Sequence, residues 1–218
     1  MLGAPWILFA VVVFGQADPP ATIGNVTDVV RFVERTGGAR RLNDPVRQKA
    51  GRRVIAAGKA TTRFQPGETG VRLAVAQIRW IDPEDPRTEA ARVKYVKSSV
   101  AEFNRRLKAR GLAPNDLADG YALSHAIFHE AYTGKPVDGA TVKANRMQLH
   151  KALLAHPGYQ GMPSVERQEI YDKYAALALF ALDLRTRSVR EVDPRRGGLI
   201  RRAKDHALGS GFFSAVRE

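Results

Sequence analysis

An uncharged stretch in the second half of the chain constrains its fold most strongly. The segment Tyr174-Ala-Ala-Leu-Ala-Leu-Phe-Ala-Leu182 carries no charged side chain, and a helix that is apolar on every side must be surrounded by other elements. We therefore expect a helix from Ser164, the N-cap that follows Pro163, to around Ser188, at the centre of the core. Its apolar positions are at helical spacing: Ile170, Tyr174, Leu177, Ala181 and Leu184.

Further segments have the same helical spacing, with start and stop signals at their ends. We predict helices from the cap Asp85-Pro86 to Gly111, from the N-cap Asn115 to Gly134, from about Thr141 to Ala155, and from Asp193-Pro194 to Gly209. The connections between them are short, and helices joined in this way pack as an antiparallel bundle. The predicted fold class is all-α, with the bundle over residues 84–211 and a C-terminal tail over 212–218.

Residues 18–83 are less regular, and we expect an N-terminal extension of short helices and loops. A short helix is predicted over 25–35 and a loop over 61–70, where Pro66 and Gly67 interrupt any periodicity. Between them, residues 40–53 are rich in arginine, and Gly51 and Gly58 weaken a helix there. The segment 71–81 fits both a strand and a helix.

The first residues are typical of a secretory signal. The apolar run from Trp6 to Phe14 is much shorter than the about 20 residues that cross a bilayer. Gly15 and Ala17 are small residues at the positions that signal peptidase reads, so we expect cleavage after Ala17. The alternatives are a short buried helix or an uncleaved anchor. We therefore predict that residues 1–17 are a signal peptide and that the protein is periplasmic or secreted.

Composition narrows the classes of partner. The chain has no Cys, which excludes disulfides, thiol nucleophiles and Cys-based zinc sites. Lys and Arg number 35 against 22 Asp and Glu, a net charge of +13. In an exported protein this charge favours an anionic envelope polymer, a lipid head group or an acidic protein. Nucleic acid would be the expected partner only if the chain stayed in the cytosol.

A basic turn near the C-terminus is the leading candidate for a binding site. Five cations fall within ten residues, and a helix places the last three within one turn, where they can hold a phosphate or carboxylate. A second basic cluster lies over residues 40–53. The alternative is a solvated helix face. The predicted anion-binding residues are Arg195, Arg196, Arg201, Arg202 and Lys204.

Two histidines on the second predicted bundle helix are weaker candidates for a metal site. His125 and His129 are four residues apart, so they share a helix face, and Glu130 or Asp119 is the nearest source of a third ligand. The order of residues differs from the metalloprotease motif, in which the acid follows the first His. His125 also falls on the apolar stripe of its helix, which favours a histidine in the seam between helices.

Carboxylates three residues apart occur at the start of the central helix. Glu166, Glu169 and Asp172 offer acid-base chemistry, but acids are expected near a helix start because of the helix dipole. We find no nucleophile elbow, phosphate loop or dinucleotide fingerprint. The sequence therefore predicts no cofactor.

Three segments carry a resemblance to a known family. Gly111-Leu-Ala-Pro-Asn-Asp-Leu-Ala118, Arg167-Gln-Glu-Ile-Tyr-Asp-Lys-Tyr174 and Leu199-Ile-Arg-Arg-Ala-Lys-Asp-His-Ala-Leu-Gly209 occur in that order, after the loop Thr61-Thr-Arg-Phe-Gln-Pro66. Together they resemble the bacterial domain-of-unknown-function 6683 family over roughly residues 60–210. The resemblance implies an exported helical protein without an assigned reaction, so no catalytic residue is carried over. The basic stretch over residues 40–53 lies outside it.

These observations favour a non-catalytic module. We expect an exported bacterial protein that binds or scaffolds at the cell envelope through a basic surface. The alternative is a periplasmic hydrolase with a histidine or carboxylate site on the second bundle helix. A continuous basic face would favour binding, and acids converging in a closed cleft would favour the enzyme.

Overall fold

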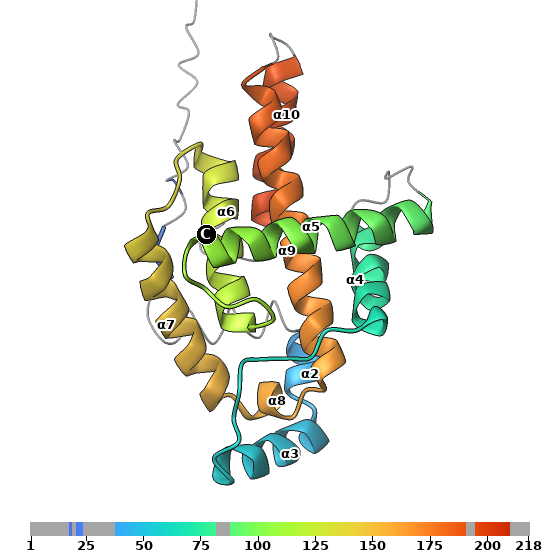
Figure 1. Cartoon of the computed structure of the whole chain (residues 1–218), viewed down its shortest axis with the longest axis vertical. Helices are drawn as coiled ribbons and strands as arrows, with labels where there is room; N and C mark the ends of the chain where they lie inside the picture. The colour runs from blue at the N-terminus through green and yellow to red at the C-terminus, as the bar shows by residue number, and fades with distance from the viewer. Residues whose placement is uncertain (1–17, 19–20, 24–37, 82–87, 191–194, 210–218) are drawn as a thin grey trace, which may run out of the picture.

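The computed structural model describes residues 18, 21–23, 38–81, 88–190 and 195–209, and the fold within them is all-α, as predicted. The leader, the helix predicted over 25–35 and the C-terminal tail lie outside the described residues. Figure 1 shows the helices α2 (Ala39–Leu42), α3 (Pro45–Ala56), α4 (Glu68–Ile81), α5 (Glu89–Ala109), α6 (Leu117–Thr133), α7 (Gly139–Ala155), α8 (Pro157–Gln160), α9 (Ser164–Ser188) and α10 (Arg195–Gly209).

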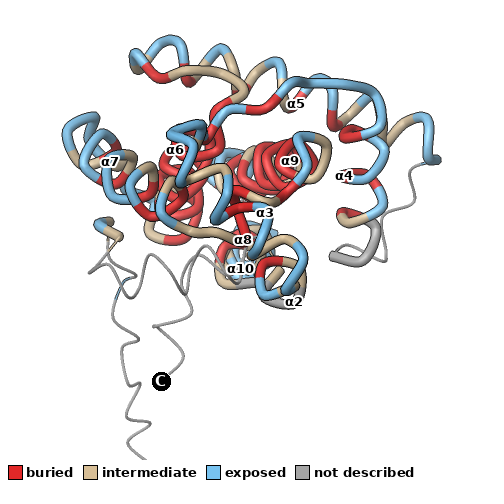
Figure 2. Tube along the Cα trace, turned by 90° about the horizontal axis from the view of Figure 1, so that it is seen from below, coloured by how far each residue is buried: buried red, intermediate tan, exposed pale blue. Residues whose placement is uncertain are grey.

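The helix α9 is the centre of the core, which confirms the prediction from its uncharged stretch. It packs against α4, α5, α6 and α10, and Figure 2 shows α6 and α9 largely buried between more exposed helices. Leu177 is 6 % exposed, and the alanines around it let neighbouring helices approach closely. Burying each large apolar side chain contributes about 1.5 to 3 kcal/mol. None of the helices in the described ranges combines the length and apolar character needed to span a membrane.

The helices are arranged in two directions. Figure 1 shows α6 and α7 running antiparallel, and α9 and α10 likewise, whereas α6 and α9 run parallel to each other. The helices α5 and α3 lie across this group, α5 over its middle and α3 at its lower end. The helices α4, α5 and α9 all contact one another.

Close backbone contacts join the N-terminal helices to the rest of the molecule. A Cβ on Gly51 of α3 would lie 1.7 Å from the Pro157 carbonyl oxygen of α8, and one on Gly158 would lie 1.9 Å from the Leu42 carbonyl oxygen. Gly51 does not interrupt the helix, because α3 continues through it. Only a residue without a side chain lets α3 and α8 approach this closely.

The segment 71–81 is helical, so the strand alternative is wrong. Val71, Ala74, Val75 and Ile78 are buried at helical spacing, whereas Leu73, which a strand would bury on the same face as Val71, is 37 % exposed. The helix already begins at Glu68, so the loop predicted over 61–70 ends at Gly67.

Two predicted helix starts are wrong by a few residues. The described part of α5 begins at Glu89 rather than at Asp85-Pro86, because Thr88 is extended and its side chain accepts a hydrogen bond from the Ala91 amide. The N-cap of α6 is Asp116, not Asn115, since Asp116 accepts hydrogen bonds from the amides of Ala118 and Asp119. Asn115 has φ 57°, a left-handed conformation that Asn tolerates better than most residues.

The ends of the other helices agree better with the sequence. The helix α6 ends at the left-handed Gly134, and α9 spans 164–188 as predicted, although Pro163 rather than Ser164 is its N-cap. The helix α7 begins two residues before Thr141, at Gly139, and Asp138 is its N-cap. The start predicted for the last helix, Asp193-Pro194, lies outside the described residues.

Candidate functional site

Two arginines of the basic cluster over residues 40–53 form ion pairs inside the fold, whereas Lys49, Arg52 and Arg53 are exposed. The guanidinium of Arg41 donates to both carboxylate oxygens of Glu169, at 3.0 and 3.1 Å. That of Arg47 donates to both oxygens of Glu166, at 2.7 and 2.8 Å. These bidentate pairs fix α2 and α3 to the start of α9. Two of the three carboxylates proposed for acid-base chemistry are therefore structural partners of arginine.

The two histidines of α6 lie inside the core. His125 is 2 % exposed and His129 is 8 % exposed. Burial, and secondarily the neighbouring His129, lowers the pKa of His125 to about 3, so its ring is neutral at physiological pH. His129 Nδ1 lies 3.3 Å from the carbonyl oxygen of Lys135. His125 thus occupies the seam position that its place on the apolar stripe predicts.

The acids near these histidines are oriented elsewhere. Asp119 accepts a hydrogen bond from the Ala113 amide at 2.7 Å and pairs with Arg146 Nε at 2.6 Å. Glu130 is half-buried at the far end of α6. Within the described ranges, no group of three His, Asp or Glu side chains is placed to hold a metal ion.

The basic cluster near the C-terminus lies at the surface. Arg195, Arg196, Arg201 and Arg202 are exposed on α10. Within the described part of the chain, none of these four guanidinium groups pairs with a carboxylate. The fifth predicted residue, Lys204, is directed away from them, with Nζ 4.8 Å from the centre of the Tyr132 ring on α6.

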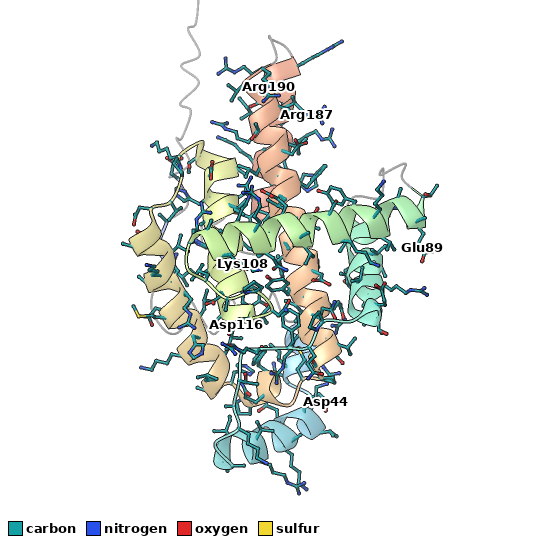
Figure 3. The ribbon with its side chains drawn as sticks, in the orientation of Figure 1. Asp44, Glu89, Lys108, Asp116, Arg187 and Arg190 are labelled. Atoms are coloured by element: carbon teal, nitrogen blue, oxygen red, sulfur yellow. The ribbon has the colours of Figure 1, made fainter. Side chains whose placement is uncertain are left out.

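The end of α9 adds residues that the sequence prediction missed. Arg187 and Arg190 are exposed at the upper end of the molecule in Figure 3, where α10 also begins. Arg187 Nη1 lies 3.7 Å from Asp183 Oδ2, a loose and exposed ion pair. Between them, Val189 is an apolar residue that is 72 % exposed. The basic tip is defined here as Arg187, Arg190, Arg195, Arg196, Arg201 and Arg202.

A pocket of about 470 Å³ lies between α4, α5 and the first half of α9. Glu68 and Val71 of α4 line one side, and Lys97, Val100 and Asn104 of α5 line the other. Lys97 Nζ and Glu68 Oε1 are 2.7 Å apart and form an exposed ion pair between the two helices. The remaining lining comes from two connecting segments and from α9: Pro66, Gly67, Asn115, Gln168 and Asp172.

Hydrogen bonds fix the polar side of the pocket. Gln168 Oε1 accepts from the Gly67 amide at 2.7 Å, and Gln168 Nε2 donates to the Gly67 carbonyl and to Asp172 Oδ2, both at 2.9 Å. A Cβ on Gly70 would lie 2.3 Å from the Gln168 side chain, so the absence of a side chain there makes room for this amide. The Gln168 amide therefore has one orientation and holds Asp172 in place.

Asp172 is the buried acid of this pocket. It is 2 % exposed, and burial raises its pKa to about 6, against the opposing effect of the hydrogen bond from Gln168. A buried carboxylate without a cation beside it is destabilised in its charged form. Asp172 belongs to the set of three acids noted in the sequence, and it differs from Glu166 and Glu169 in having no arginine partner within the described residues.

Aromatic packing holds the walls of the pocket together. The Tyr171 ring lies edge-on to Phe64 and Phe103, with ring centres 5.1 and 5.6 Å apart. Tyr171 also donates a hydrogen bond from its hydroxyl to Asn104 Oδ1. These contacts link α9, α5 and the segment before α4, so the pocket is built on packed elements.

Comparison with known proteins gives one result. The family model described as "Family of unknown function (DUF6683)" matches residues 29–212. The chain belongs to the DUF6683 family. No curated protein matches the chain, and no solved structure does.

The DUF6683 match confirms the resemblance seen in the sequence and extends it. It includes the basic segment 40–53, which the quoted motifs had left outside, so that expectation is wrong. The segments that carry the resemblance also contribute to both candidate sites. Gln168 and Asp172 lie in the segment 167–174, Asn115 lies in 111–118, and Arg201 and Arg202 lie in 199–209.

Proposed function

We propose that this DUF6683 protein is an exported, non-catalytic binding module that attaches to anionic phospholipid surfaces of the cell envelope through its basic tip. The observation that carries the proposal is the grouping of exposed arginines where α9 ends and α10 begins. An acidic patch on another protein and an anionic envelope polymer are the competing partners.

Local charge is the first argument for the basic tip. Each Lys or Arg near an anionic lipid surface contributes about 1 kcal/mol to attachment. Arg187 and Arg190 lie at the upper end of the molecule, opposite α3, and the four arginines of α10 lie in the first half of that helix, which begins at the same end (Figures 1 and 3). Arg41 and Arg47, by contrast, are neutralised by Glu169 and Glu166. The basic tip therefore has six exposed arginines, whereas the exposed arginines on α3 are Arg52 and Arg53.

An exposed apolar side chain favours a lipid surface over a soluble polymer. Val189 is 72 % exposed between Arg187 and Arg190. An apolar group flanked by cations can enter the boundary between head groups and acyl chains while the guanidinium groups remain at the phosphates. A polysaccharide or polyphosphate chain offers no such apolar region.

The predicted export of the protein favours the same class of partner. Residues 1–17 have the pattern of a cleaved secretory signal, which would deliver the mature chain to the envelope, where phospholipid head groups are abundant. A strongly basic protein is attracted electrostatically to such an anionic surface.

Vesicle binding tests the proposal. We expect the protein to co-sediment with vesicles containing phosphatidylglycerol and to remain in solution with phosphatidylcholine vesicles, with attachment falling as salt is added. A variant with Arg195, Arg196, Arg201 and Arg202 changed to Gln should bind at least about 100-fold more weakly, since it loses four surface cations.

A control variant that loses the same number of positive charges distinguishes a local binding site from an effect of the overall charge of the protein. Lys49, Arg52, Arg53 and Lys59 are exposed on and after α3, and changing these four to Gln removes the same number of positive charges. The proposal predicts nearly unchanged vesicle binding for this control. Equal loss in both variants would contradict a local site. Retention of the protein by a soluble anionic polymer but not by vesicles would replace the lipid with the polymer.

A further inference from the structure

We propose that the pocket between α4, α5 and α9 binds a small organic cation, whose ammonium group meets the carboxylate of Asp172. This inference is independent of the basic tip and of attachment to lipid.

The carboxylate of Asp172 is only partly hydrogen-bonded. Asp172 Oδ2 receives the hydrogen bond from Gln168 Nε2, and no hydrogen bond from the described residues reaches Oδ1. Asp172 lines the pocket, so a ligand in the pocket can donate to the second oxygen. A buried carboxylate normally has a cation or several donors around it. The arrangement therefore lacks one positive or donating group.

The lining of the pocket is negatively charged. The titratable side chains that line the pocket are Asp172 of α9, Glu68 of α4 and Lys97 of α5. Lys97 is paired with Glu68, so the lining carries one net negative charge through Asp172. The chain as a whole has a net charge of +13. A locally negative pocket in a strongly basic protein excludes anions and selects a cation.

The pocket has an apolar part and a polar part. Val71 and Val100 face the pocket from α4 and α5, and Asp172 and Gln168 line it from α9. A ligand with a short apolar body and an ammonium group at its end fits both parts. The volume of about 470 Å³ is in the range of small-molecule sites. The Gly67 backbone and the Gln168 side-chain amide are hydrogen-bonded to each other, so this side of the pocket is formed without a ligand.

Calorimetric titration with 1,4-diaminobutane tests the proposal, and 1,4-butanediol, of similar length and without charge, is the comparison ligand. The unmodified protein should bind the diamine at least about tenfold more tightly than the diol at pH 7.5, because charge-assisted hydrogen bonds are the stronger kind. Diamine affinity should fall as the pH drops through about 6, where Asp172 gains a proton. Equal binding of the two compounds, or no diamine binding at millimolar concentration, would overturn the proposal.

Variants locate the site. Asp172→Asn should weaken diamine binding at least about tenfold. Asp183→Asn, an exposed acid of the same helix outside the pocket, should leave it unchanged. If Asp172→Asn does not fold, Val100→Phe fills the pocket from α5 and should abolish diamine binding in a folded protein. Unchanged diamine binding in a folded Asp172→Asn or Val100→Phe variant would place the diamine elsewhere and overturn the proposal.

Discussion

At the residue scale, two buried titratable side chains affect stability in opposite directions. Asp172 has a raised pKa and His125 a lowered one, each chiefly because burial disfavours the charged form. The protonated, neutral carboxyl of Asp172 suits the folded state, and so does the deprotonated, neutral ring of His125. Acidification therefore stabilises the protein through the first group and destabilises it through the second.

Replacing Asp172 with Asn should stabilise the protein near neutral pH. Between the ordinary pKa near 3.8 and the folded pKa of about 6, the folded state binds more protons, so the stabilising effect of a neutral carboxyl is lost as the pH rises. Asp172→Asn should raise the free energy of unfolding by roughly 1 to 3 kcal/mol at pH 7.5 and by much less at pH 4. Urea unfolding at the two pH values measures this, with the exposed Asp183→Asn as the control.

A gain in stability in Asp172→Asn would indicate that Asp172 serves binding. A residue whose charge weakens the fold, and which a neutral side chain of the same shape would improve, is typical of a binding site rather than of a structural role. If Asp172→Asn is less stable than the unmodified protein at pH 7.5, Asp172 is structural instead, and the pocket loses its main support.

Replacing His125 with Gln should reduce sensitivity to mild acid. The folded pKa of about 3 lies below the ordinary 6.5, so the unfolded state binds more protons in that window and stability falls as the pH is lowered through it. Thermal unfolding between pH 7 and pH 4 should show a smaller loss in His125→Gln than in the unmodified protein. The same substitution at the half-buried His150 should leave the loss as it was. Parallel losses in all three proteins would show that His125 does not contribute.

At the element scale, the contact between α3 and α8 depends on backbone atoms that lie unusually close. Gly51, Gly158 and Gly161 each face a backbone carbonyl of the opposing segment, at distances that a Cβ cannot share. The N-terminal helices are thus joined to the fold by glycine contacts and by the Arg41 and Arg47 ion pairs.

Gly51→Ala tests this contact by the sign of its effect. Alanine in a helix interior ordinarily stabilises by up to about 1 kcal/mol relative to glycine. At Gly51 the new methyl would meet the Pro157 carbonyl, so we expect a loss of at least about 2 kcal/mol in chemical unfolding. Gly198→Ala in α10, where no atom lies within 4 Å of the added Cβ, should give the ordinary gain. A gain at both positions would contradict the close approach of α3 and α8.

Helix content could be predicted from the sequence, but contacts between elements could not. Periodicity located α9 and the end of α6, because spacing and a glycine stop are local signals. The N-cap shifted from Asn115 to Asp116 because Asp116 also accepts a hydrogen bond from Thr62 Oγ1 at 2.7 Å, from a segment distant in the chain. The role of Gly51 could not be predicted either. The carbonyl oxygen that leaves no room for a side chain at this position belongs to Pro157, which is distant in the sequence.

At the scale of the whole molecule, the same limit applies to the candidate sites. The sequence located the arginines of α10 and the acids of α9, but not which of them are paired. Arg41 and Arg47 neutralise two of the three acids, which leaves Asp172 in a pocket whose other walls come from α4 and α5. Arg187 and Arg190 complete the basic tip because α9 ends beside the start of α10 (Figure 1). Only the folded chain brings these groups together.

The proposed attachment to an envelope lipid depends on export, so the mature N-terminus is the most direct test of the account. We propose to fractionate the native host and determine the N-terminus of the protein in each fraction by mass spectrometry. The account predicts a chain that begins at Asp18, after cleavage behind Ala17, and that is recovered from the periplasm, the envelope or the medium. A chain that keeps residues 1–17 and is found in the cytosol would contradict it.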